Sequence, residues 1–75
     1  MLGLYKQMSD VDTKMTGALS QAIDYIDISW SAGNRQDWNT GFEYAGKADS
    51  AIAEAKRLQT DRNEIINEIR AIAGQ

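Results

Sequence analysis

The chain has 75 residues, a formal charge of −3 and neither cysteine nor histidine, which excludes disulfides and zinc sites built from thiolates or imidazoles. A domain of this size buries only ~60% of the surface that its unfolded chain exposes, so its core is small. Lys and Arg are spread along the chain, with only Lys56 and Arg57 adjacent, and we expect no nucleic-acid partner because such binding needs clustered bases.

The first predicted element is a helix over about residues 4–31. Apolar residues recur there every three or four positions, which is typical of one helix face. Its start lacks the basic residues and long apolar core of a signal peptide, and no run reaches the ~20 apolar residues of a membrane span. We therefore expect no membrane partner and a cytoplasmic location, in the host cytoplasm if the protein is viral. The face predicted to pack inward comprises Leu4, Met8, Val11, Met15, Leu19, Ala22, Ile26 and Trp30.

A turn at about residues 32–40 follows. Gly33 is expected to adopt the positive φ that ends a helix. Asn34 or Thr40 is expected to cap the next helix, with Asp37 or Glu43 three residues further on as in a capping box.

Aromatic residues gather around this turn. Trp30 and Phe42 continue the apolar patterns on either side, so we expect them to plug the end of the hairpin. Trp38 instead has polar neighbours, and Trp and Arg are enriched at binding hot spots. The predicted partner-binding residues are Trp38, Arg35, Asp37 and Tyr44.

The second predicted helix covers about residues 40–73 and has a heptad seam, which is typical of a coiled coil. The first half of this seam is rich in alanine and the second half in isoleucine. An all-α fold follows, an antiparallel hairpin of two long helices in one helical domain over residues 1–75. The seam comprises Tyr44, Ala48, Ala51, Ala55, Leu58, Arg62, Ile65, Ile69 and Ile72.

The two predicted helices differ in length, at roughly 42 Å for the first and 60 Å for the second if it is counted from about Asn34 to Ala73, for a rise of 1.5 Å per residue. If Leu4 lies near Arg62, the last isoleucines have no partner within the chain, and a bare apolar stripe favours a second subunit. We therefore expect a homo-oligomer that completes a bundle. The alternative is a three-helix monomer with a break near Thr60 and Asp61. The predicted self-association residues are Leu58, Arg62, Ile65, Ile66, Ile69 and Ile72.

Candidate chemistry is sparse. Asp24 and Asp27 lie one turn apart, but calcium and magnesium need about six oxygen ligands, so we expect a solvated face and no metal or cofactor. Without His or Cys, and with little concavity in a hairpin, we expect no enzyme activity.

The expected function is a non-enzymatic protein–protein interaction module. Its small size, acidity and lack of cysteine suggest an accessory or inhibitory protein of phage-like type. The alternative is a structural subunit of an oligomeric or filamentous assembly.

Overall fold

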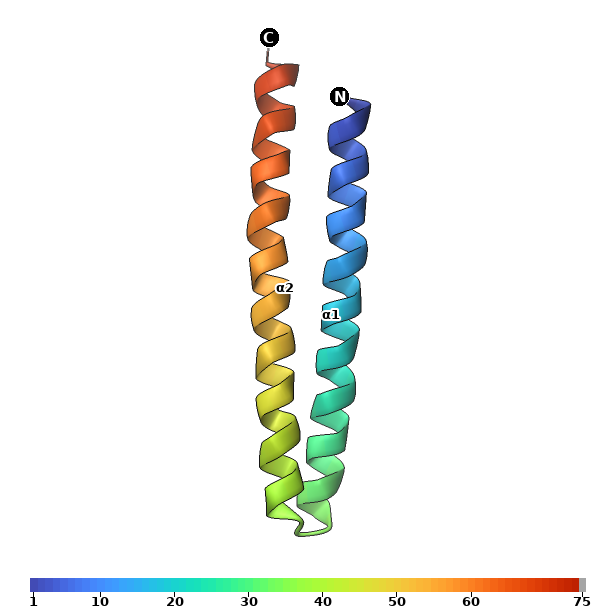
Figure 1. Ribbon diagram of the computed structural model, residues 1–75, viewed down its shortest axis with the longest axis vertical. Coiled ribbons are helices and arrows are strands. Elements are labelled where there is room, and N and C mark those ends of the chain that lie inside the picture. The colour runs from blue at the N-terminus through green and yellow to red at the C-terminus, as the bar shows by residue number, and fades with distance from the viewer. Residues whose placement is uncertain (75) are drawn as a thin grey trace.

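The computed structural model describes residues 1–74 and shows two long antiparallel helices side by side (Figure 1). Helix α1 spans Leu2–Asn34 and helix α2 spans Trp38–Ala73. Together they form a rod that extends 59 × 14 × 12 Å. The predicted all-α hairpin is confirmed. Because α2 runs through Thr60 and Asp61 without a break, the three-helix alternative is wrong.

The turn is only three residues long, Arg35 to Asp37, and it is shorter than the predicted 32–40. The amide of Asp37 donates to the Ala32 carbonyl at 2.9 Å, and the amide of Gln36 donates to the Gly33 carbonyl at 3.0 Å. This pair of bonds is a Schellman motif, which needs a left-handed residue after the helix. That residue is Gln36, with φ of 60°, and not Gly33, which lies inside α1.

Asp37 both closes this motif and begins α2. Its side chain accepts a hydrogen bond from the Thr40 amide at 3.4 Å, which satisfies one of the free amides of the first helical turn. The cap is thus neither Asn34 nor Thr40, the two residues predicted from the sequence.

The predicted seam of α2 lies against α1. Leu58 is 4% exposed, and the seam alanines Ala48, Ala51 and Ala55 are buried with it. Further along, Ile65 and Ile69 are half-buried. Large side chains therefore fill the half of the hairpin near the chain ends, while alanines fill the half near the turn.

The seam of α1 differs from its prediction in the half near the turn. The observed seam follows a strict heptad from Leu4. The predicted stripe instead took the larger apolar neighbours of the seam at Leu19, Ile26 and Trp30. Leu19, Ile26 and Trp30 are consequently exposed. The observed seam, buried or half-buried throughout, is Leu4, Met8, Val11, Met15, Ala18, Ala22, Tyr25, Ser29 and Ala32.

Close approach of the two backbones explains this choice of small residues. A Cβ atom added to Gly41 would lie 3.6 Å from the Ser29 carbonyl oxygen, and the Ser29 hydroxyl donates to the Gly41 carbonyl at 2.8 Å. An isoleucine or tryptophan does not fit between helices that come this near. The bulky residues of α1 therefore lie beside the seam.

The predicted length mismatch is wrong. With 33 residues in α1 and 36 in α2, the helices differ by less than one turn. Arg62 donates to the carboxylate of Asp12 at 2.6 Å, so it lies level with Asp12 and not with Leu4. Ile65 and Ile69 then lie level with the first turns of α1, which cover them. Self-association through the isoleucines stays a prediction. The argument for it is weaker, because Ile65 and Ile69 were expected to be uncovered and are half-buried.

Candidate protein-binding surface

One side of the hairpin near the turn carries large apolar side chains that the rest of residues 1–74 leaves largely exposed. They occupy the positions that directly follow the seam residues, so they form a stripe along the same edge of each helix. Ile23 is 59% exposed, Trp30 71% and Trp38 61%. We call this surface the apolar flank. It comprises Leu19, Ile23, Ile26 and Trp30 of α1 with Trp38, Ala45 and Ile52 of α2.

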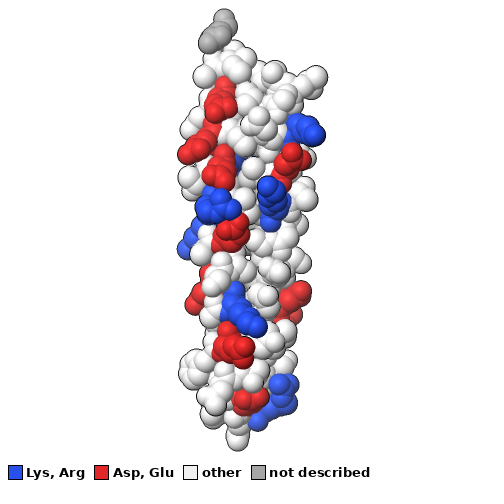
Figure 2. All heavy atoms as spheres, viewed as in Figure 1, with Lys and Arg blue, Asp and Glu red and all other residues white. Residues whose placement is uncertain are grey.

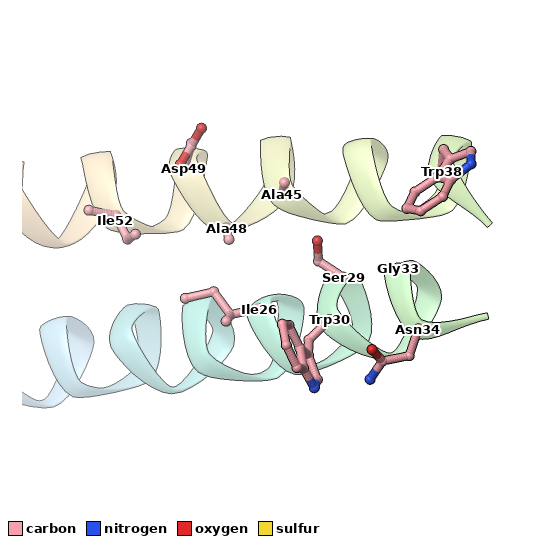
Figure 3. A pocket seen from close by; sticks show the side chains of 10 residues that line it. All are labelled: Ile26, Ser29, Trp30, Gly33, Asn34, Trp38, Ala45, Ala48, Asp49 and Ile52. Carbon is pink, nitrogen blue, oxygen red and sulfur yellow. The ribbon is translucent and has the colours of Figure 1, made fainter. Parts of the chain in front are cut away.

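The apolar flank contains an open groove of about 530 Å³ between the two helices. Trp30 and Trp38 lie on opposite helices at its turn end, and Ile26 and Ile52 lie further from the turn (Figure 3). Its floor is made by the small seam residues Ser29 and Ala48. The close-packed seam thus makes a shallow apolar trough between taller side chains.

Asp49 is the only charged residue among those that line the groove. It lies on α2 one turn before Ile52, and its carboxylate points away from α1 (Figure 3). Within residues 1–74 it forms no ion pair. A single exposed carboxylate therefore marks one edge of an otherwise apolar surface.

The other edge of the hairpin, lined by Gln21, Lys47, Ser50 and Glu54, is polar. We call it the polar flank. Arg57 donates to Glu54 at 3.0 Å through Nε, and this hydrogen bond, more than the charge of the guanidinium, lowers the pKa of the Glu54 carboxyl. The same contact raises the pKa of Arg57. Both groups are exposed, so the pair is screened by solvent.

Charges on the surface are mixed in sign. Figure 2 shows one face of the rod, on which acidic and basic side chains are interspersed along the whole length. No large field of one sign develops there. The difference between the flanks is therefore one of polarity, not of net charge.

The structure does not bring together the four residues predicted to bind a partner. Trp38 lies on the apolar flank, and Arg35 is exposed in the turn. Asp37 caps α2. Tyr44 is half-buried, with its ring centroid 5.8 Å from that of Tyr25, and the ammonium of Lys47 lies 4.6 Å from the Tyr44 ring. Tyr44 is thus a seam residue.

Trp30 and Phe42 do not plug the end of the hairpin. Phe42 is 77% exposed, more than any other aromatic residue of the chain, and Trp30 stands on the rim of the groove (Figure 3). Sequence reasoning assigned both to the core because they continue apolar patterns. The informative signal was the alanine-rich seam of α2, which brings the helices close together and leaves little room for bulky side chains opposite.

The predicted self-association residues also differ from one another in burial. Leu58 is buried and Arg62 is paired with Asp12, so both act within the hairpin. Ile65, Ile66 and Ile69 are half-buried, and Ile72 is exposed.

No protein-family model, curated protein or solved structure matches this chain. Neither helix, over the residues that the structure describes, has a stretch long and apolar enough to cross a membrane. Within residues 1–74, no three acidic side chains come close enough together to hold a metal ion. The chemical features of the surface are therefore the basis for any functional assignment.

Proposed function

We propose that the hairpin is a non-enzymatic protein-binding module and that its apolar flank is the contact surface. The observation that carries this proposal is the exposure of Ile23, Trp30 and Trp38 along one edge of both helices. Monomeric soluble proteins rarely expose contiguous apolar patches larger than a few hundred Å², and larger patches mark interaction sites.

The composition of the flank suits protein recognition. Tryptophan anchors dominate the binding energy of many interfaces when they enter a desolvated pocket. Trp30 and Trp38 line the same groove from opposite helices, together with two isoleucines. A helix laid along this trough would contact both helices, in the helix-in-groove mode of recognition.

An accessory or inhibitory role, of the kind found in small phage proteins, fits a module of this size that acts by covering part of another protein. The alternative role is a structural subunit of a larger assembly. It is favoured by the position of the flank along the side of a 59 Å rod, because lateral contact between rods builds bundles. A closed symmetric contact gives a defined oligomer, and an open one gives a filament.

Site-specific photo-crosslinking in the source cell tests the proposal. A benzophenone amino acid replaces Trp38 on the apolar flank, and in a matched variant it replaces Gln21 on the polar flank. We expect protein adducts from position 38 and none, or far fewer, from position 21. Adducts of equal yield from both positions, or none from position 38, would contradict the proposal. The adduct mass identifies the partner class, since a product of twice 8.3 kDa is a homodimer.

A further inference from the structure

This inference rests on the proposed function, because it names a partner for the same surface. We propose that the apolar flank binds the apolar flank of a second copy in a parallel dimer, with the two turns at the same end and the two-fold axis running along the groove. Helix α2 of each copy then lies on α1 of the other. The two hairpins together form a four-helix bundle.

Parallel packing brings the apolar halves of the two flanks together by symmetry. A two-fold axis along the rods places each level of one hairpin against the same level of the other, so the half near the turn meets the half near the turn. The polar residues that continue the flank toward the chain ends then meet polar residues. These residues are Asp12 and Thr16 of α1 with Gln59 and Asn63 of α2.

Antiparallel packing covers less of the rod. An antiparallel pair keeps its apolar halves together only if the rods overlap by those halves alone, and the other half of each rod then lies outside the contact. The parallel pair overlaps along the whole rod. The broad side of the rod is about 59 × 14 Å, close to the ~800 Å² that each partner buries in an interface of standard size. The area therefore favours the parallel pair as a stable dimer.

The side chains in the middle of the groove are complementary in size in this arrangement. The bounds of the two helices set the level of each residue, because residues equally far from the turn lie side by side. On this count Ala45 lies level with Ile26, to within about one residue. Ile52 lies level with Leu19 in the same way. Ala45 is small and half-buried, whereas Ile26 is 50% exposed. In the dimer Ile26 of each copy would pack over Ala45 of the other, and Leu19 would contact Ile52.

Gly33 supplies an independent argument for this partner. It lies inside α1 without a positive φ, and within residues 1–74 an added Cβ atom would meet nothing within 4 Å outside its own stretch of helix. A glycine in such a position weakens the helix relative to alanine, and the single hairpin gives no reason for it. Gly33 and Trp38 line the same end of the groove (Figure 3). In the dimer the indole of Trp38 from the other copy would rest on the bare backbone of Gly33.

Asp49 keeps its water in this dimer. Its carboxylate points away from α1 (Figure 3), and therefore toward the outer edge of the contact and not toward its middle. Burial of a carboxylate without a cation would oppose binding, and a position at the edge avoids this penalty.

Substitution of Gly33 separates association from folding. Gly33→Leu places a side chain where the single hairpin has open space and where the dimer has the indole of Trp38. By sedimentation equilibrium of the full chain, we expect the parent to dimerise and Gly33→Leu to raise the dissociation constant at least about tenfold. Circular dichroism at low concentration should show an equal or higher melting temperature, because leucine favours a helix more than glycine does. The control Gly17→Leu makes the same change at an exposed, uncrowded position of α1 away from the flank, and should leave association unaltered.

Cysteine pairing tests the orientation, since the natural chain contains no cysteine. Ile26→Cys in one chain and Ala45→Cys in another become neighbours across the parallel contact. Two copies of Ala45→Cys instead lie on diagonally opposite helices. A disulfide needs a short Cα separation, so under mild oxidation the mixture of the two variants should form a covalent dimer at least about tenfold faster than Ala45→Cys alone. An equal or faster reaction of Ala45→Cys alone would place α2 on α2 and overturn the parallel orientation.

Two further outcomes overturn the inference. One is a parent protein that stays monomeric at several hundred micromolar. The other is a Gly33→Leu variant that associates as well as the parent. Neither outcome removes the proposed function, because the crosslinker at position 38 would still capture a different protein. Loss of both the dimer and all adducts at position 38 would remove both proposals.

Discussion

The two halves of this hairpin distribute their side chains in opposite ways. Near the chain ends, large residues such as Met15, Leu58 and Ile65 face the partner helix. Near the turn, alanines face the partner helix, and the isoleucines and tryptophans lie beside the seam. The difference teaches that a heptad can specify helix contact mostly with small residues, which here are joined by the packed pair Tyr25 and Tyr44. The bulky apolar residues displaced from such a seam then form an exposed surface.

The largest expected effect is in the half near the chain ends. Leu58→Ala removes the only large side chain within residues 1–74 that is almost fully buried, so we expect a loss of about 3 kcal/mol in the free energy of unfolding. Urea denaturation followed by circular dichroism measures it. The control is Ile28→Ala, which truncates an exposed side chain and should cost about 1 kcal/mol or less. Equal losses would show that the buried and exposed positions are not energetically distinct.

The half near the turn should respond to the opposite change. Ala51→Leu adds volume between closely packed backbones, and we expect it to lower the free energy of unfolding by about 2 kcal/mol. Ala53→Leu makes the same substitution at an exposed position of α2 and should change stability by a few tenths of a kcal/mol, since Leu and Ala have similar helix propensities. Thermal melting of the two variants compares them. A stabilising Ala51→Leu would mean that the seam has unfilled space.

The smallest effect concerns the turn itself. Gln36 has φ of 60°, a left-handed conformation that glycine adopts without steric cost. We expect Gln36→Gly to raise the free energy of unfolding by up to about 1 kcal/mol. Arg35→Gly is the matched control, because Arg35 has φ of −89°, where glycine only adds freedom to the unfolded chain and should destabilise. A destabilising Gln36→Gly would show that the glutamine side chain stabilises the turn.

The sequence predicted α2 well, because nearly every seam position from Tyr44 to Ile72 holds an apolar residue in an unbroken heptad. It predicted the extent of α1, and the seam of α1 as far as Met15 and again at Ala22. The other seam positions near the turn hold Ala18, Tyr25, Ser29 and Ala32, and the larger residues next to them carry the stronger apolar signal. The missing information was the distance between the helices, which the small residues of both seams determine together.

The turn and the candidate surface were predictable only in part. Asp37 was assigned to a capping box and to partner binding, whereas it is the cap itself. Gln36 carries no sequence signal for a left-handed conformation, since residues with a side chain rarely adopt it. Trp38 was predicted to be a contact residue and does lie exposed. The surface around it was missed, because Leu19, Ile26 and Trp30 were assigned to the core.

The antiparallel arrangement of α1 and α2 has an electrostatic consequence for any partner. Each helix carries a macrodipole equivalent to about half a charge at each end. The negative C-terminus of α1 lies beside the positive N-terminus of α2 at a turn of three residues, so the two dipoles largely cancel. The rod therefore has almost no backbone polarity along its length. Which way a bound molecule points along it must be decided by individual side chains, and in the groove of the apolar flank the charge available for this is that of Asp49.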